Sequence, residues 1–498
     1  MVYFYLLSGL FIGWSMGAND TGNIFGAAVS TRMIKFSQAA LIAAIFYTLG
    51  AFLEGSGPSG TLGRLGSIDA IGGAFTVALA AALAIVAIVR LGIPVAVSQT
   101  IVGAIIGWNY FSGRITDFNS LITIASSWII AFIVSAAVAA LFFYLMRRWI
   151  NRSRLHLLEQ DMIIRYALVV FGAIAAYFLG ANTIANAIGV FVPVTPFKDL
   201  TIGSMFSLTG VQQLYLVGAL SVVLGIYTYS HKVMGTVGHE IYKLSPATAL
   251  VALLAETFVL FLFSSRGLHN LLLSIGLPAV PLVPISSTQA MVGAVLGIGL
   301  AKGGKNIKYN VLGKVSLAWI VAPLMAFLLS FVALYISQNV FELQVRLPIT
   351  YTVDKAAVKE IEQRGIDTKH LSFVNLRTFK TERELYKELM EEDFYTPEEI
   401  KIIISICENY PLLVNVELLN KGGLNRRFTE EQLKALSELD GKKFKRKWNL
   451  AQALSEYPAW KFIEPPQTRA DEEHNEDLKS DLEIIYKVFY FPSDNNNL

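Results

Sequence analysis

Two short polar motifs interrupt apolar sequence, and each of them occurs twice. Residues 17–23 (GANDTGN) and 180–186 (GANTIAN) share the pattern G-A-N-x-x-x-N. Residues 94–107 and 284–297 share the longer pattern P-x-x-x-S/T-Q-x-x-V-G-A-x-x-G. Because both pairs occur in the same order along the chain, they predict an internal repeat. Polar side chains within apolar segments are costly in hydrocarbon and must face protein, water or a ligand.

The longer motif is typical of an anion site. Proline is favoured in the first turn of a helix, so Pro94 and Pro284 are expected to begin new helical stretches. Free backbone N–H groups at a helix N-terminus bind anions, and hydroxyl and amide side chains supply further donors. The side chains expected near these two helix starts are Ser98, Gln99, Thr100, Ser286, Ser287, Thr288 and Gln289.

The shorter motif carries Asp20, an isolated carboxylate that calls for a cation or a proton. Glu256 is the other acidic residue within an apolar segment. Cations bound together with an anion would balance its charge, and hard oxygen ligands suit Na⁺. A proton on Asp20 or Glu256 is the alternative, but neither repeated motif contains histidine. The asparagines of the motifs have a second possible role, which is to satisfy broken helix ends: Asn19, Asn23, Asn182 and Asn186.

The composition places these motifs in a polytopic membrane protein. Hydrophobic residues make up 54% of the 498 residues and charged residues only 16%, whereas soluble domains carry about 25% charge. Of the 38 acidic residues, 29 follow Asn339. This predicts a membrane region followed, from a boundary near 338–350, by a mainly helical soluble domain. The net charge of +3 is too small to indicate nucleic-acid binding.

Apolar segments and basic loops predict the topology. Basic residues cluster in alternate loops, and placing these loops in the cytoplasm puts both termini on the outer side of the plasma membrane. The clusters contain Arg32, Lys35, Arg147, Arg148, Arg152, Arg154, His231, Lys232, Lys243, Lys302, Lys305 and Lys308. The ten apolar segments lie near 3–28, 37–53, 70–89, 94–111, 119–146, 163–189, 203–228, 248–265, 280–300 and 312–337.

Each half contains five predicted spans, and an odd number of spans gives the second copy the opposite orientation in the membrane. We therefore expect an all-α fold of two inverted repeats, 1–160 and 161–337, followed by an extramembrane domain over 338–498. Inverted repeats are a transporter architecture with the binding site near the midplane. The glycines within the motifs favour broken or re-entrant helices, because irregular backbone at membrane depth must line a cavity or be buried.

The paired motifs resemble those of the inorganic phosphate transporter (PiT) family, close to its bacterial sodium/phosphate symporters, over about residues 1–337. The resemblance implies import of inorganic phosphate with Na⁺ by an elevator-like or rocking alternating-access mechanism, in a homodimer embedded in lipid. It implies phosphate ligands at Asn19, Asp20, Ser98, Gln99, Thr100, Asn182, Thr183, Ser287, Thr288 and Gln289. It implies Na⁺ ligands at Asp20, Asn23, Ser98, Asn186, Glu256, Ser286 and Ser287.

Three departures from the family pattern leave the Na⁺:phosphate stoichiometry open. The second short motif usually carries Asp where this chain has Thr183. The paired S/T motifs often contain His where this chain has Gln99 and Gln289, which favours Na⁺ over H⁺. Glu256 matches a family Glu of the second half, and its first-half partner would fall near Tyr47.

Other functions remain as alternatives. They are an H⁺-coupled symporter of phosphate or another oxyanion, an anion channel, and a phosphate sensor that signals through the C-terminal domain. An enzyme is not expected, since no nucleophile–base pair or metal-ligand cluster is recognisable.

The C-terminal third carries signals of its own. Thr396 and Thr429 predict helix starts, and Cys407 is expected to be a buried thiol. The basic run 442–447 is expected to be a solvated face, and the segments 471–483 and 492–498 to be partly disordered.

Overall fold

The protein divides into two compact units. The helical unit comprises Met1–Phe111, Thr116–Phe197 and Thr209–Arg346, and the C-terminal unit comprises Ser112–Ile115, Lys198–Leu208 and Leu347–Leu498. The computed structural model describes residues 2–66, 68–91, 93–153, 155–197, 199–202, 206–231, 244–304, 307–371, 374, 376–391, 394–422, 424–465 and 469–491. Arg154, Lys232, Lys243, Lys305 and the segment 492–498 lie outside the described residues.

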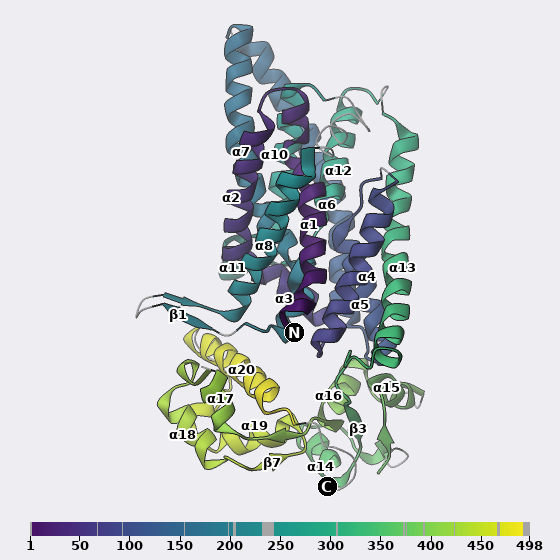
Figure 1. The fold of residues 1–498 in the computed structure, drawn as a ribbon, viewed down its shortest axis with the longest axis vertical. Helices are drawn as coiled ribbons and strands as arrows, with labels where there is room; N and C mark the ends of the chain where they lie inside the picture. The colour runs from purple at the N-terminus through teal and green to yellow at the C-terminus, as the bar shows by residue number, and fades with distance from the viewer. Residues whose placement is uncertain are drawn as a thin grey trace. The chain divides into compact units, whose positions relative to one another are not determined.

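The helical unit is built from long helices that run side by side along one direction (Figure 1). Several begin with the capping residues that helix starts require. Asp117, for example, accepts the backbone N–H of Ser120, and Ser245 precedes Pro246 at the first turn of its helix. The elements are η1 (Val2–Leu6), α1 (Leu7–Ser30), α2 (Phe36–Glu54), α3 (Ser56–Leu65), α4 (Ile71–Val89), α5 (Val97–Ser112), α6 (Phe118–Arg152), α7 (Leu157–Ile188), η2 (Gly189–Val194), α8 (Gly210–Thr228), α10 (Pro246–Ser264), α11 (Arg266–Ser274), α12 (Ser287–Ala301) and α13 (Tyr309–Asn339).

Seven stretches among the described residues are long and apolar enough to cross a membrane. They are Phe36–Glu54, Ile71–Val89, Phe118–Arg152, Leu157–Val194, Gly210–Thr228, Pro246–Ser264 and Tyr309–Asn339. The other three predicted segments correspond to α1, which carries the polar motif, and to the short helices α5 and α12. The protein is therefore a multi-pass membrane protein, with helices too short to cross alone at the two longer motifs.

Non-helical backbone precedes both short helices. Residues 93–96 run into α5, and residues 275–286 run into α12. Pro94 and Pro284 lie within these segments, three residues before the helices begin at Val97 and Ser287. The expectation that the prolines occupy the first helical turns is therefore wrong, although the short helices themselves agree with the prediction of interrupted spans.

The two shorter motifs do not break their helices. Helix α1 continues through residues 17–23, and α7 continues through residues 180–186. The prediction of irregular backbone at these motifs is wrong because their glycines serve close packing instead. A Cβ on Gly17 would collide with the Val222 carbonyl oxygen, and one on Gly180 with the Tyr47 carbonyl oxygen.

Close approaches of this kind occur in matched pairs between the two halves. Gly50 meets the carbonyl of Tyr177, as Gly225 meets that of Trp14. The glycines of the longer motif pack in the same manner on α13 and α6. Gly103 and Gly107 meet the carbonyls of Pro323 and Phe327, whereas Gly293 and Gly297 meet those of Phe132 and Ala136.

The C-terminal unit combines short helices with small antiparallel sheets, ordered β4-β3-β5 and β6-β7, around its own apolar core. The β1-β2 hairpin also belongs to this unit. Thr396 and Thr429 cap α16 and α18 at the predicted helix starts, where both form capping boxes, and Cys407 is buried as expected. The elements are β1 (Leu200–Ile202), β2 (Phe206–Leu208), β3 (Thr350–Thr352), α14 (Lys355–Gln363), η3 (Lys369–Leu371), β4 (Thr378–Phe379), α15 (Glu382–Glu391), α16 (Pro397–Cys407), β5 (Glu408–Asn409), β6 (Leu412–Leu413), α17 (Val416–Gly422), η4 (Leu424–Arg427), α18 (Glu430–Glu438), β7 (Lys443–Phe444), α19 (Lys447–Ser455), η5 (Pro458–Trp460) and α20 (Arg469–Phe489).

One expectation for this unit holds in part and another is wrong. Lys442, Lys443 and Lys445 of the basic run 442–447 are exposed as expected. Arg446, within the basic run, is only 1% exposed and pairs with Asp354 at 2.9 Å. The segment 471–483 belongs to helix α20, whose Leu478, Leu482 and Ile485 pack in the core. Charged residues thus cover the outer face of a helix whose apolar face is buried, which composition alone does not reveal.

Replacing Asp354 with Asn is expected to destabilise the C-terminal unit by about 3 kcal/mol, because it leaves Arg446 buried without its counter-charge. Burial alone would raise the pKa of Asp354, but hydrogen bonds from Arg446, the Ala357 N–H and Lys445 outweigh it and hold this pKa well below its ordinary value. The stabilisation is therefore present at neutral pH and is lost as the pH falls below the ordinary range of an aspartate. Urea unfolding of the full chain, with Glu391→Gln in an exposed ion pair as control, measures the effect. Equal midpoints for both variants would contradict it.

Candidate functional site

The structure buries every side chain that the two motif pairs predict for the site. All of them lie in the helical unit, and none is more than 7% exposed. The set consists of Asn19, Asp20, Asn23, Ser98, Gln99, Thr100, Asn182, Thr183, Asn186, Glu256, Ser286, Ser287, Thr288 and Gln289.

The first short motif meets the second long motif. The Asn23 amide donates to the Ser287 hydroxyl at 3.1 Å and to the Thr288 hydroxyl at 3.3 Å. The Asn19 amide lies 2.9 Å from a carboxylate oxygen of Asp20 and 3.5 Å from the Thr288 hydroxyl oxygen. Helix α1 from the first half therefore contacts the start of α12 from the second half.

The starts of the two short helices are joined through Thr288. Its hydroxyl donates to the carbonyl oxygen of Val95 at 3.3 Å, two residues before α5 begins. Ser286 caps α12 by accepting the backbone N–H of Gln289 at 3.2 Å. The first turns of α12 thus lie against the segment that enters α5, which brings two helix N-termini into one buried region.

Asn182 holds the backbone that leads into α12. Its amide nitrogen donates to the Val283 carbonyl at 2.9 Å, and its amide oxygen accepts the Ile285 N–H at 2.9 Å. These two bonds satisfy buried backbone groups that no regular element pairs. The role matches the alternative in which motif asparagines satisfy interrupted backbone.

Thr183 pairs with a residue that the sequence motifs do not include. Its hydroxyl lies 3.1 Å from the Tyr47 hydroxyl and also donates to the Leu179 carbonyl at 2.8 Å. Tyr47 is 2% exposed and lies on α2. Only its occurrence within an apolar helix hints at a polar partner, because the pairing residue is 136 positions away. The carbonyls of Val95 and Val283 also accept hydrogen bonds in this region. The sequence could not predict them, because every residue carries a backbone carbonyl and its type gives no signal.

Several buried oxygens in this region have no hydrogen-bond donor. Among the described residues they include Ser98 Oγ, Gln99 Oε1, Asn186 Oδ1, Gln289 Oε1 and both carboxylate oxygens of Glu256. Buried acceptors are normally satisfied, so each of these needs a donor or a cation.

The buried charges of the helical unit also favour a bound cation. In the described part of the helical unit, Asp20 and Glu256 are the buried carboxyl groups, and no Lys, Arg or His side chain is buried. Carboxylate, amide and hydroxyl oxygens without protein cations can coordinate a hard cation, whereas helix N-termini next to them suit an anion.

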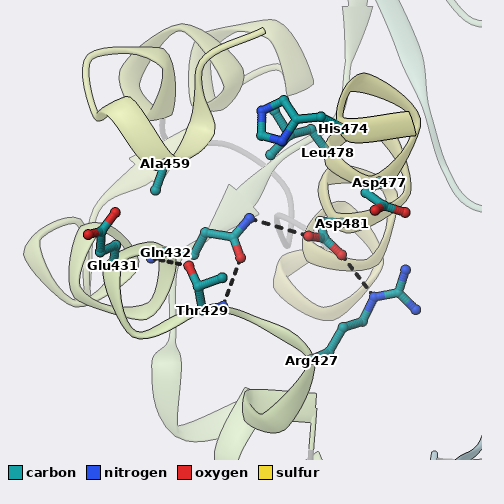
Figure 2. Close-up of a pocket in the computed structure, with 9 residues that line it drawn as sticks. All are labelled: Arg427, Thr429, Glu431, Gln432, Ala459, His474, Asp477, Leu478 and Asp481. Carbon is teal, nitrogen blue, oxygen red and sulfur yellow. Dashed lines mark hydrogen bonds and ion pairs between the residues drawn. The ribbon is translucent and has the colours of Figure 1, made fainter. Parts of the chain in front are cut away.

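A polar pocket lies within the C-terminal unit and has a volume of about 480 Å³. His474, Asp477 and Asp481 reach it from helix α20 (Figure 2). Asp481 accepts Arg427 Nε at 2.8 Å and Gln432 Nε2 at 3.3 Å. Because protein partners occupy both oxygens of this carboxylate, the cavity is a weaker candidate than the buried region between the helices.

Known proteins match this chain over about two thirds of its length or more. A family model described as the phosphate transporter family matches residues 16–270 and 280–487. A provisionally named phosphate permease of Methanocaldococcus jannaschii is 27% identical over 332 residues, which cover 67% of this chain and 94% of the relative. Another, from Haemophilus influenzae, is 25% identical over 427 residues, covering 68% of this chain and 97% of the relative.

A solved structure shares the fold. The structure titled "The sodium-dependent phosphate transporter" superposes with a TM-score of 0.54 at 20% identity, and the match covers 68% of this chain and 98% of that one. The family match spans most of the sequence and includes both short motifs. The chain therefore belongs to the phosphate transporter family.

Proposed function

We propose that this protein imports inorganic phosphate together with Na⁺ by alternating access. Phosphate transport follows from the family, and the coupling ion is inferred from the site. The observation that carries the proposal is the set of buried oxygens without donors in the helical unit, which includes both carboxylate oxygens of Glu256, together with the buried carboxylate of Asp20. Without bound cations, two carboxylates and several amide oxygens would remain uncompensated at membrane depth, and the phosphate would add further negative charge.

The proposed Na⁺ ligands come from both halves. Asp20, Asn23, Ser286 and Ser287 lie where α1 meets the start of α12, and a hydrogen bond already joins Asn23 to Ser287 there. The unpartnered oxygens of Ser98, Asn186 and Glu256 supply further hard ligands. Na⁺ is preferred to H⁺ because hydroxyl and amide oxygens coordinate a cation but do not carry a proton at neutral pH.

Phosphate is proposed to bind at the N-termini of α5 and α12, which offer N–H groups and the positive ends of two helix dipoles. Asn19, Gln99, Thr100, Thr288 and Gln289 complete the proposed donor set. The Thr100 and Thr288 hydroxyls would redirect to phosphate the bonds that they now donate to the carbonyls of Ala96 and Val95. Asp20 can accept a hydrogen bond from the protonated oxygen of phosphate. Sulfate at neutral pH has no such proton, so the same carboxylate would repel it. Asn182 and Thr183 complete the proposed set, with part of their hydrogen-bonding capacity already used by Ile285 and Tyr47.

The matched glycine contacts support an arrangement of two inverted repeats. Gly17 with Val222 corresponds to Gly180 with Tyr47, and Gly103 with Pro323 corresponds to Gly293 with Phe132. Two copies of one packing arrangement can exchange conformations, which opens the shared site to either side in turn. A homodimer is proposed from the family resemblance.

The charge distribution supports an orientation in the plasma membrane. Arg32 and Lys35 follow α1, Arg147 and Arg148 lie in the last two turns of α6, and Lys302 follows α12. The ends of α1, α6 and α12 lie at the same end of the helical unit (Figure 1). Placing that end in the cytoplasm puts the start of α1 and the end of α13 on the outer side.

Uptake of labelled phosphate into proteoliposomes tests the proposal. An inward Na⁺ gradient is expected to drive accumulation, an inward H⁺ gradient in Na⁺-free buffer is not, and excess sulfate is expected not to compete. Uptake driven only by the H⁺ gradient would support the proton symporter instead. Binding of phosphate without any uptake would support the sensor.

A further inference from the structure

An apolar groove lies between three helices of the helical unit. Side chains of α6, α7 and α10 line it, and its volume is about 350 Å³. Among the lining residues, Ile164 and Leu250 are buried, whereas Leu145, Trp149 and Ile163 are between 37% and 53% exposed. The groove therefore has a protein floor and an open rim. Its size falls within the roughly 300–1,000 Å³ of ligand pockets.

The groove lies at the level where α6 leaves the hydrocarbon of the membrane. No charged residue occurs over residues 118–146, and about 20 apolar residues suffice to cross the hydrocarbon. Arg147 and Arg148 follow this stretch directly. Trp149, at the rim of the groove, is of a residue type that favours the membrane interface. One end of the groove therefore meets hydrocarbon, and the other end meets the headgroup region.

Two arginines of α6 lie beside the headgroup end of the groove. The lining positions 142, 145, 146 and 149 form one stripe along this helix. Arg152 comes three residues after Trp149 and seven after Leu145, so it continues the stripe. Arg148 lies three residues after Leu145 and four before Arg152. Both arginines are exposed, and their spacing places them next to each other on the helix surface.

No described residue forms an ion pair with these two arginines. Like charges four residues apart on a helix repel each other, so the pair calls for an anion from outside the chain. The nearest acidic residues in the sequence, Glu159 and Asp161, lie at the start of α7. Glu159 already accepts the backbone N–H of His156 at 3.0 Å. An apolar groove and a pair of unneutralised cations thus adjoin at the membrane interface.

We propose that this groove binds an anionic phospholipid. An acyl chain lies between α6, α7 and α10, and the phosphate of the headgroup lies between Arg148 and Arg152. Guanidinium groups form strong hydrogen bonds with phosphate oxygens, and basic pockets between membrane helices suit anionic headgroups. Charge complementarity selects an anionic lipid over phosphatidylcholine, whose headgroup carries its own cation. The site is separate from the buried region around Asp20 and does not depend on which ion drives transport.

Quenching of Trp149 fluorescence by brominated lipids tests the assignment. The full-length protein is reconstituted in phosphatidylcholine vesicles that contain either phosphatidylglycerol or phosphatidylcholine brominated on the upper part of one acyl chain. The signal of Trp149 is the difference between the wild type and Trp149→Phe. We expect phosphatidylglycerol to associate at least about fivefold more strongly than phosphatidylcholine.

Two variants and a charge-matched control locate the site. In Arg148→Gln/Arg152→Gln the preference is expected to fall to within about twofold of equality. Ile163→Phe narrows the groove without changing its charge and is expected to weaken the preference as well. Arg32→Gln/Arg90→Gln removes two exposed arginines that follow α1 and α4, and it is expected to keep the wild-type preference.

Several results would overturn the inference. Equal quenching by both lipids in the wild type would make the groove ordinary lipid-facing surface. Absence of quenching by either lipid would show that protein, such as a second copy of this chain, covers the groove. A preference that survives in folded Arg148→Gln/Arg152→Gln, or that falls equally in the control, would exclude the two arginines as ligands of the headgroup. Thermal unfolding of each variant shows that the protein is folded.

Discussion

Replacing Asp20 with Asn is expected to lower Na⁺-driven phosphate uptake at least about 100-fold, which corresponds to about 2.7 kcal/mol. The substitution keeps the shape of the side chain and its capacity to accept from Asn19, but it removes one of the two buried carboxylates of the described helical unit. The proposed cation site then loses its charge, and a cation at membrane depth has little else to compensate it. Initial uptake rates under a fixed inward Na⁺ gradient measure the effect.

Asp161→Asn provides the matched control. This carboxylate lies near the start of α7, is only partly buried and does not belong to the proposed site. It should transport at the wild-type rate. Uptake by Asp20→Asn within about twofold of that control would remove Asp20 from the coupling site. Retained uptake that no longer depends on Na⁺ would show that the residue binds the ion but that phosphate can move without it.

Truncating Gln289 to Ala is expected to lower uptake at least about 30-fold, or about 2 kcal/mol. Its Oε1 has no donor in the protein, so the side chain is available to a ligand at the start of α12. The helix start should survive the substitution, because Ser286 accepts the backbone N–H of residue 289 rather than its side chain. The loss should therefore appear in transport and not in folding.

The control for this variant is Gln452→Ala, an exposed position on α19. Uptake and thermal unfolding are measured for both proteins. Normal uptake by Gln289→Ala would exclude its amide from the phosphate and Na⁺ sites. A large fall in unfolding temperature would reassign the residue to helix packing.

Much of the site could be predicted from the sequence because polar residues are rare in its membrane segments. The repeated motifs predicted residues that are all buried in the helical unit, and the step in acidic content after Asn339 lies close to Leu347, where the main part of the C-terminal unit begins. The helix starts at Thr396 and Thr429 could also be predicted from the sequence, because a capping box depends only on residues three positions apart.

The rest depends on contacts between distant parts of the chain. The glycines of the short motifs were expected to unwind α1 and α7, but they instead allow carbonyls of α8 and α2 to approach, which requires knowledge of the neighbouring helix. The hydrogen bond between the Tyr47 and Thr183 hydroxyls and the buried ion pair of Arg446 with Asp354 also join residues far apart in the sequence, so neither could be predicted from local sequence. The placement of Gly113 and Arg114 within the C-terminal unit has no local signal either.

Phosphate-driven movement of sodium tests the central claim most directly, because coupling between two transported species must act in both directions. Proteoliposomes are given equal Na⁺ on both sides, a trace of labelled Na⁺ outside and an inward phosphate gradient, with the membrane potential clamped to zero. We predict that labelled Na⁺ accumulates transiently inside with the wild-type protein, and that Asp20→Asn shows no accumulation. Na⁺ entry that is indifferent to the phosphate gradient, in a preparation that takes up phosphate, would contradict Na⁺ symport by this protein.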